Sequence, residues 1–280
     1  MTKIAFFGSS EYSNIILKKL LTLPEFEVSL VITKIDKPFG RDKLITPNPV
    51  AKFAKDHNLK LVQVETFDSS FKLLVTSFHC DIGLCVAFGP PFFDQEMIDL
   101  FPHKIVNIHP SPLPKYRGAT PGPWQIINGE VTSAVTFFQI DSLPDHGPLI
   151  AQFPFEISAT DTADSFYQKA FLLAANNLSS ILKTPTTLQD HSQKSYYPKL
   201  SKDSAKIDWG WNEEKIERFI RALYPWPIAW TFVANHQQDL IRMKIFSAEF
   251  NKHLILKTVQ LEGKNKTIWS EISSHYRIIK

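Results

Sequence analysis

Residues 106–118, VNIHPSPLPKYRG, bring together side chains that could carry out acyl transfer. Asn107 and His109 are two positions apart, so in a β-strand they project from the same face. A carboxamide can donate a hydrogen bond to a developing oxyanion, and an imidazole can donate, accept or carry charge near neutral pH. The spacing alone is common, and a strand end with a hydrogen-bonded histidine explains it equally well.

A carboxylate is the third group that such chemistry requires. The segment DSLPDHGP (141–148) offers Asp141 and Asp145. Asp145 lies between Pro144 and Gly147, residues typical of a tight turn, and a role in the turn is the simpler interpretation of this residue alone. Placed beside His109, however, its carboxylate would orient the ring and favour the charged form of the imidazole.

Three prolines follow the histidine, at positions 110, 112 and 114. Each fixes its own φ angle and lacks an N–H donor, so this segment cannot continue as a helix. The sequence therefore predicts a stiff loop that could form one wall of a pocket.

The surrounding sequence predicts the elements that position these groups. Short apolar runs rich in β-branched residues predict strands at 3–8, 27–33, 81–89 and 104–110. Runs that are apolar throughout suit strands covered on both faces. Helical patterns lie between them, at 12–23, 49–58 and 69–78. This alternation predicts an α/β fold with a doubly wound, mostly parallel sheet, in which ligands bind at the carboxyl ends of the strands.

The rest of the chain predicts a second, smaller module. Two strands (133–140 and 148–157) and a long helix (162–183) should complete a catalytic domain over residues 1–183, and the polar segment 184–206 is predicted to be a linker. A helix over 212–224, with Asn212 as its cap, and short strands then predict a β-rich domain over 207–280.

Composition narrows the function classes. The formal net charge of the 280 residues is +3, and residues 207–280 contain 11 Lys and Arg against 8 Asp and Glu, so the excess lies in this last segment. Cys80 and Cys85 fit neither a disulfide framework nor a zinc pair, and the glycine pattern after the first strand does not fit a dinucleotide site. With no signal peptide or apolar run long enough for a membrane span, we expect a cytoplasmic protein that needs no metal and no membrane partner.

The motifs together resemble the 10-formyltetrahydrofolate-dependent formyltransferases over nearly the whole chain. VNIHPSPLPKYRGATP is similar to the family's N-x-H signature and its folate loop, and DSLPDHGPLI resembles its D-x-x-x-D-x-G element. The resemblance implies a Rossmann-like catalytic domain in which Asn107, His109 and Asp145 are catalytic. It also implies that 10-formyltetrahydrofolate, a co-substrate, lies against Val86, Ala87, Phe88, Ser111, Pro112, Leu113 and Pro114.

Other stretches resemble the family members that formylate initiator methionyl-tRNA for translation initiation. The segment 37–54, KPFGRDKLITPNPVAKFA, is similar to a loop that reaches the tRNA acceptor stem, which implies tRNA contacts for Arg41 and Lys43, and the turn after the first strand implies one for Tyr12. Residues 198–230 resemble the approach to an OB-like carboxyl-terminal domain. That domain is short here, so one or more strands of a five-stranded barrel are expected to be missing. We expect a monomer. Two alternatives remain: a sugar-nucleotide N-formyltransferase with the same donor, and a non-catalytic folate- or RNA-binding relative with the same fold.

Overall fold

The computed structural model describes residues 1–39, 44–182 and 185–279. The chain divides into two compact units, each assembled from several segments. Unit 1 comprises Met1–Arg117, Ala134–Phe155 and Gln168–Tyr196. Unit 2 comprises Gly118–Ser133, Glu156–Tyr167 and Tyr197–Lys280. The predicted linker segment is therefore shared, with its first part in unit 1 and its second part in unit 2.

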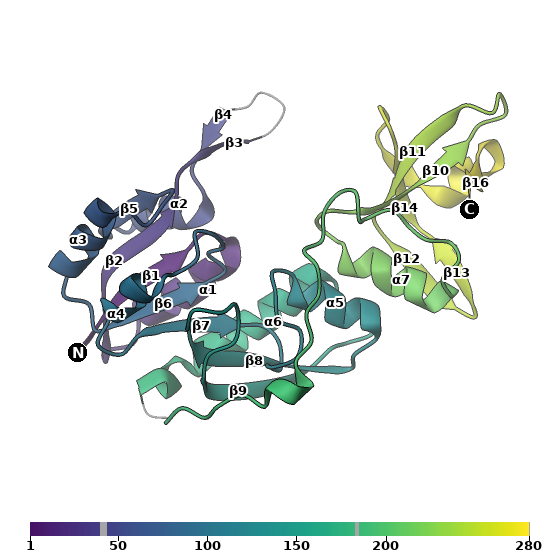
Figure 1. Cartoon of the computed structure of the whole chain (residues 1–280). Helices are drawn as coiled ribbons and strands as arrows, with labels where there is room; N and C mark the ends of the chain where they lie inside the picture. Colours follow the sequence, from purple (N-terminus) through teal and green to yellow (C-terminus); the bar gives the residue numbers. More distant parts are fainter. Residues whose placement is uncertain (40–43, 183–184, 280) are drawn as a thin grey trace. The chain divides into compact units, whose positions relative to one another are not determined.

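A seven-stranded sheet has the order β5-β2-β1-β6-β7-β8-β9 (Figure 1). Its strands are β1 (Thr2–Gly8), β2 (Phe26–Lys34), β5 (Leu61–Val64), β6 (Ile82–Val86), β7 (Ile105–His109), β8 (Thr132–Gln139) and β9 (Leu149–Glu156). The pairs from β5 through β7 are parallel, and β8 runs antiparallel to β7. The mostly parallel sheet is confirmed. The short strand β5 was not predicted from the sequence, and three of its four residues are half-buried.

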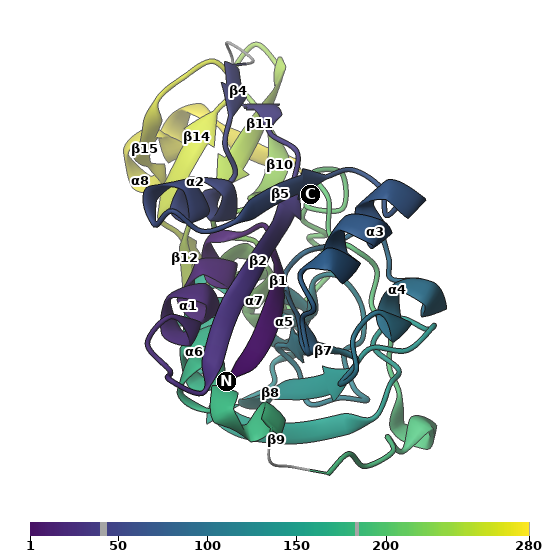
Figure 2. The same ribbon diagram turned by 90° about the vertical axis from the view of Figure 1, so that its left-hand side faces the viewer.

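Helices cover both faces of this sheet, as a doubly wound fold requires. Figure 2 shows α1 (Glu11–Leu20) and α2 (Pro49–Asp56) on one face and α3 (Ser69–Ser77) and α4 (Gln95–Asp99) on the other. The side chains of Ser10, Asn48 and Asp68 cap the first three of these helices. β3 (Lys37–Phe39) and β4 (Leu44–Thr46) form a separate hairpin. α6 (Ala163–Asn176) gives way to a 3₁₀ turn at Leu178–Leu182, so it is shorter than predicted.

The core on the α3 and α4 side of the sheet is aromatic. The ring of Phe7 on β1 meets four others edge-on, with centroid distances from 5.0 to 6.2 Å. These partners are Phe67, Phe88, Phe93 and Phe101. Edge-to-face pairs of this kind contribute beyond their buried area. Because the ring of Phe88 packs in this cluster, it anchors the turn that follows β6 to the core.

Unit 2 contains an antiparallel sheet with the order β15-β14-β11-β10-β16. The strands are β10 (Ala229–Ala234), β11 (Leu240–Ile245), β14 (Thr258–Leu261), β15 (Lys266–Ile268) and β16 (Arg277–Ile279), and a hairpin is formed by β12 (Ala248–Asn251) and β13 (His253–Leu256). The helices are α5 (Pro121–Asn128), α7 (Glu213–Ala222) and α8 (Trp269–Ile272). Asn212 caps α7 as predicted. The sheet has five strands, so the expected loss of a strand is not observed, although β15 and β16 are short.

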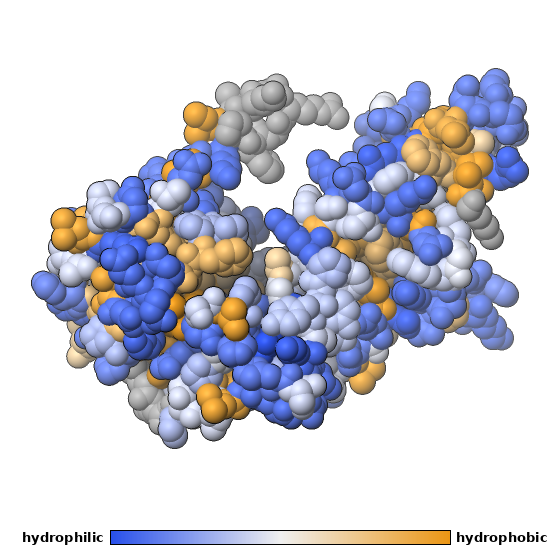
Figure 3. Space-filling model, viewed as in Figure 1, coloured by the Kyte–Doolittle hydropathy of each residue, from blue (hydrophilic) through white to orange (hydrophobic). Residues whose placement is uncertain are grey.

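On the face drawn in Figure 3, apolar surface occurs in separate patches. Leu73 and Phe92 are examples of exposed apolar residues, and Figure 3 shows small orange patches among mostly hydrophilic ones. Scattered patches of this kind are normal for a folded protein. None of the helices in the described ranges is long and apolar enough to cross a membrane.

Candidate active site

β7 presents the two polar residues from one face, near the carboxyl end of the strand. Asn107 is paired with Cys85 of β6 and Phe138 of β8, and His109 with Thr136 of β8. The Asn107 side chain is half-buried and has no hydrogen-bond partner among the described residues. Its carboxamide can therefore donate to a substrate without breaking an internal bond. His109, in contrast, is 5% exposed and held by its surroundings.

The His109 ring has an oxygen atom opposite each nitrogen. Nε2 lies 3.0 Å from the carbonyl oxygen of Tyr116, and Nδ1 lies 3.6 Å from Oδ1 of Asp145. A carbonyl oxygen only accepts, so Nε2 carries a proton and donates it to Tyr116. The Nδ1 separation is within ion-pair range but longer than a hydrogen bond. Nδ1 therefore faces the carboxylate of Asp145 and the space beside it.

The two candidate carboxylates have different partners. Asp141 accepts from the main-chain N–H of Leu143 at 3.0 Å and pairs with Nδ1 of His146 at 2.6 Å. Asp145 is the one that reaches His109. The geometry therefore favours Asp145 over Asp141 as the partner of the histidine. His146 is half-buried and stacks on His191 with a centroid distance of 4.1 Å.

Backbone geometry explains why Asp145 and Gly147 stand where they do. Asp145 has a φ of +51°, in the left-handed region that aspartate tolerates better than most residues. A Cβ atom added to Gly147 would lie 1.9 Å from the carbonyl oxygen of Gln139. Only glycine lets the two ends of the loop approach this closely. The loop is thus closed at its base by Gly147, and Asp145 projects from it toward β7.

Two buried residues with no role predicted from the sequence hold this loop. Gln189 is 5% exposed, and its Nε2 donates to the carbonyl oxygens of Asp145 at 3.1 Å and Gly147 at 2.7 Å. Arg117 is 1% exposed and donates to Oε1 of Gln189 at 2.6 Å. Gln189 lies in a polar segment without periodicity, so its signal in the sequence is weak. Arg117 stands within the stretch 106–118, but nothing in the spacing assigns it a role.

The turn after β6 forms one side of the predicted folate region. Val86 and Phe88 are buried, whereas Ala87 is exposed and has a φ of +47°. The hydroxyl of Ser9 donates to the carbonyl oxygen of Ala87 at 2.9 Å and fixes the turn. A Cβ atom added to Gly89 would meet no other atom within 4 Å. A flat ligand could therefore approach the main chain here, while the Phe88 ring belongs to the core.

Lys34, at the end of β2, supports the same turn. Its ammonium donates to the carbonyl oxygens of Gly89 and Pro90 and lies 3.6 Å from the centroid of the Phe88 ring. Partial burial of the ammonium lowers the pKa of Lys34 to about 8, with the nearby Lys37 acting in the same direction and Cys85 opposing it. The charged form of Lys34 is therefore destabilised at this position, next to the turn.

The proline-rich loop after β7 is fixed by buried hydrogen bonds. The carbonyl oxygen of Ser111 accepts from the Thr136 hydroxyl at 2.6 Å, and that of Leu113 accepts from Gln152 at 2.6 Å. Ser111 and Leu113 are buried, and Pro112 and Pro114 are partly exposed. These hydrogen bonds hold the loop against β8 and β9, and its partly exposed prolines offer apolar surface.

Of the three residues predicted to contact tRNA, the structure describes Tyr12. Tyr12 lies in the first turn of α1, half-buried, and stacks on Phe171 with a centroid distance of 5.8 Å. Arg41 and Lys43 lie outside the described residues. No group of His, Cys, Asp and Glu side chains that could hold a metal ion occurs in the ranges that the structure describes.

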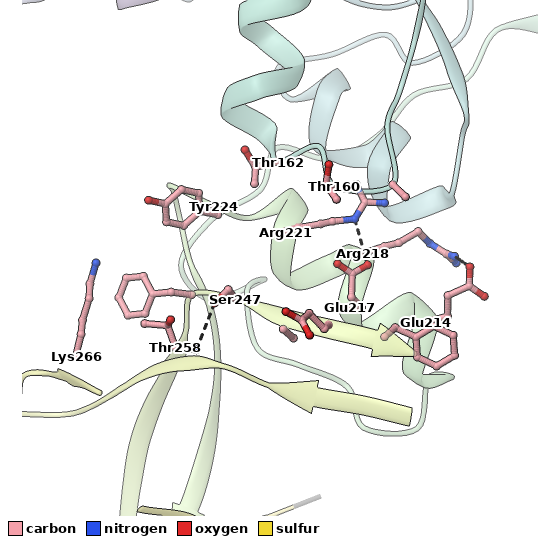
Figure 4. A pocket seen from close by; sticks show the side chains of 15 residues that line it. Thr160, Thr162, Glu214, Glu217, Arg218, Arg221, Tyr224, Ser247, Thr258 and Lys266 are labelled. Atoms are coloured by element: carbon pink, nitrogen blue, oxygen red, sulfur yellow. Dashed lines mark hydrogen bonds and ion pairs between the residues drawn. The ribbon is translucent and has the colours of Figure 1, made fainter. Parts of the chain in front are cut away.

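Unit 2 contains a cavity of about 650 Å³ that is distinct from these residues. Figure 4 shows two ion pairs in its lining, Arg218 with Glu214 at 2.6 Å and Arg221 with Glu217 at 3.1 Å. Its lining has as many acidic as basic side chains, with Glu249 and Lys266 completing the set. A balanced lining gives no preference for an anionic or a cationic ligand.

Comparison with known families agrees with the geometry. Residues 2–182 match the formyl transferase family, and residues 199–268 match the formyl transferase carboxyl-terminal domain. A methionyl-tRNA formyltransferase of Thermodesulfovibrio yellowstonii is 32% identical over 260 residues, covering 91% of this chain and 84% of that protein. One of Acetivibrio thermocellus is 32% identical over 270 residues, covering 94% and 86%.

Solved structures share the fold at lower identity. A methionyl-tRNA formyltransferase from Clostridium thermocellum superposes with a TM-score of 0.63 at 16% identity, covering 93% of this chain and 99% of that one. A 4-N formyltransferase from Francisella tularensis gives a TM-score of 0.65 at 18% identity, covering 89% and 99%. The fold is therefore shared by formyltransferases with different names. Since the family match spans both parts of the sequence and the relatives align over most of their length, this chain belongs to the formyl transferase family.

Proposed function

We propose that the protein transfers a formyl group from 10-formyltetrahydrofolate to the free amino group of methionine on initiator tRNA. The observation that carries the proposal is the approach of Asp145 to His109, at 3.6 Å, beside the Asn107 carboxamide, which has no partner among the described residues. Relatives with about one-third identity over nine-tenths of the chain bear the name methionyl-tRNA formyltransferase. For the sugar-formylating alternative, the likeness to a solved sugar 3N-formyl transferase is at 21% identity, a level that shows a shared fold alone.

In the proposed reaction the neutral amine attacks the formyl carbon, a new C–N bond forms, and the bond to N10 of the folate breaks. Negative charge develops on the formyl oxygen during attack. Asn107 and the Nδ1–H of His109 would donate to that oxygen, and one such donor typically contributes roughly 3 to 4 kcal/mol in the transition state. Asp145 would keep the ring charged and help the amine proton reach N10, directly or through water.

The folate donor fits the two loops at the carboxyl ends of β6 and β7. Ala87 is exposed beside the open space at Gly89, and Pro112 and Pro114 present partly exposed apolar rings. Small side chains and open main chain suit a planar ligand with hydrogen-bonding edges. Four of the predicted folate residues have buried side chains, so they would support the two loops from the core. They are Val86, Phe88, Ser111 and Leu113.

The tRNA would be held by positive charge and by the turn near Tyr12. We propose that Arg41 and Lys43 contact phosphates of the acceptor stem, aided by the basic segment 207–280. Removing either side chain should reduce the salt dependence of tRNA binding by about one unit of slope for each phosphate that it neutralises. We further propose a cytoplasmic monomer with domains over 1–183 and 207–280, which light scattering and limited proteolysis would test.

The decisive experiment compares acceptors with one donor. Purified protein and 10-formyltetrahydrofolate are incubated with charged initiator methionyl-tRNA, uncharged tRNA or an amino-sugar nucleotide, and formyl transfer is measured. We expect transfer to the charged tRNA alone. Transfer to the sugar alone would establish the alternative, and transfer to neither would remove the proposed activity.

A further inference from the structure

The side-chain amide of Gln189 spans the loop that carries Asp145. Both of its N–H groups are used, one for the carbonyl oxygen of Asp145 and one for that of Gly147. The residue enters from a segment that is anchored nearby, since Thr187 forms two main-chain hydrogen bonds with Leu149, at 2.7 and 2.8 Å. A buried amide with both donors satisfied holds its partners more firmly than water would.

Arg117 determines which way this amide points. Its guanidinium donates to Oε1 of Gln189, so the NH₂ group of Gln189 must face the loop. The guanidinium also contacts Nδ1 of His191 at 2.8 Å and the hydroxyl of Tyr196 at 2.9 Å. A reversed amide would place an oxygen against two carbonyl oxygens and an NH₂ group against the guanidinium.

Hydrogen bonds from main-chain N–H groups also connect Arg117 and its neighbour Tyr116, in the loop that holds His109, to Ser195. The Arg117 main-chain N–H donates to the carbonyl oxygen of Ser195 at 2.9 Å, and the Tyr116 N–H donates to the Ser195 hydroxyl at 2.9 Å. Tyr116 in turn accepts from Nε2 of His109. The segment that contains Gln189 and Ser195 therefore contacts both sides of the pair formed by His109 and Asp145.

We propose that Gln189 is a positioning residue for formyl transfer, acting through Asp145, with Arg117 fixing the orientation of its amide. The inference rests on the proposed function. It concerns a residue that would contact neither the folate donor nor the tRNA. A displacement of about 1 Å at a catalytic group can reduce turnover about 100-fold. Loss of the Gln189 amide should therefore reduce kcat and leave donor binding intact.

Two variants separate the contact with the loop from the contact with Arg117. Gln189→Glu keeps the volume and gains an ion pair with Arg117, yet replaces both donors to the loop with an acceptor. Gln189→Met keeps the approximate volume and loses every hydrogen bond. We expect kcat to fall about 10- to 100-fold in both, with the KM for 10-formyltetrahydrofolate changed less than about threefold. A Gln189→Glu protein with kcat within about twofold of wild type would overturn the proposal.

A double-mutant cycle tests the route through Asp145. In an Asp145→Asn background, measured in single turnovers at high enzyme concentration, Gln189→Met should have little further effect. If its full effect persists there, Gln189 does not act through Asp145. As a matched control, Gln125→Met removes another fully buried glutamine, which accepts from the Ser133 hydroxyl at 2.6 Å, and should lower stability without a selective loss of kcat.

A structural readout keeps this test independent of the proposed function. In crystals of Gln189→Glu we expect the distance between Nδ1 of His109 and the Asp145 carboxylate to exceed the present 3.6 Å. An unmoved Asp145 would contradict the inference even if kcat fell. A wild-type protein that transfers no formyl group would refute the proposed function, whereas the position of Asp145 would still show whether Gln189 holds the loop.

Discussion

Nε2 of His109 lies 3.0 Å from the main-chain carbonyl oxygen of Tyr116, seven residues further along the chain. Tyr116 has a φ of +58°, so its backbone adopts a conformation that is unfavourable for most side chains in order to present this oxygen. The main chain of the proline-rich loop thus orients the ring, with Nε2 as the donor. Nδ1 is left to face Asp145 and the space where the formyl group would lie.

Asp145→Asn should lower kcat by about 100- to 10,000-fold, because an amide neither stabilises the imidazolium nor takes up a proton. The variant has the same shape, so the dissociation constant for a folate analogue should change less than about threefold. Rapid-quench formyl transfer and folate fluorescence measure the two quantities. A variant with wild-type kcat would show that the carboxylate is not required.

His109→Ala should lower kcat by a similar factor. It also removes the hydrogen bond that the ring donates to the carbonyl oxygen of Tyr116, a buried residue, so some loss of stability is expected. Thermal unfolding measured beside kcat separates the two effects. If kcat per folded molecule is unchanged, the histidine is a structural residue of the strand end.

Gly147→Ala should displace the loop that carries Asp145. The new methyl group would meet the carbonyl oxygen of Gln139, which is main chain and cannot rotate away. We expect a loss of more than about 2 kcal/mol in the free energy of unfolding, together with reduced kcat. Gly263→Ala is the matched control, since its Cβ would meet nothing within 4 Å and its φ of +73° imposes only the backbone cost. Equal losses in both would remove the argument for a steric requirement at 147.

Much of this fold could be predicted because its signals are local. The apolar runs of β1, β2, β6 and β7 and the helix cap at Asn212 follow directly from residue type and period. The pairing of His109 with Asp145 could not be derived from spacing, since Asp141 has the same chemistry. The resemblance to a known family was needed to choose between them.

The burial and the contacts of Gln189 could not be predicted from the sequence. Its neighbours are polar and lack periodicity, so the segment was interpreted as a linker. Its burial arises from contacts with residues 42 and 44 positions earlier and with Arg117, 72 positions earlier. Long-range hydrogen bonds of this kind leave no local pattern.

Both thiols should resist alkylation in the folded protein. Burial raises the pKa of Cys80 to about 11 and that of Cys85 to about 12. At about pH 8 only about one in a thousand Cys80 thiols would be ionised, and the thiolate is the reactive form. Iodoacetamide labelling followed by mass spectrometry should show both cysteines modified only after denaturation. Rapid labelling of either in the native state would contradict the buried positions.

Lys34 should make stability depend on pH in the alkaline range. Its pKa is about 8 in the folded protein and 10.5 in an unperturbed lysine, so between these values the unfolded chain binds more protons at this position. Wild type should therefore gain stability relative to Lys34→Met as the pH rises from 8 to 10.5. The difference should be constant below about pH 7, where the lysine is protonated in both states, and that range serves as the internal control. Urea unfolding of both proteins at about pH 6, 7, 9 and 10 measures it. A difference that stays flat across the whole series would show that the Lys34 ammonium is not destabilised beside Phe88.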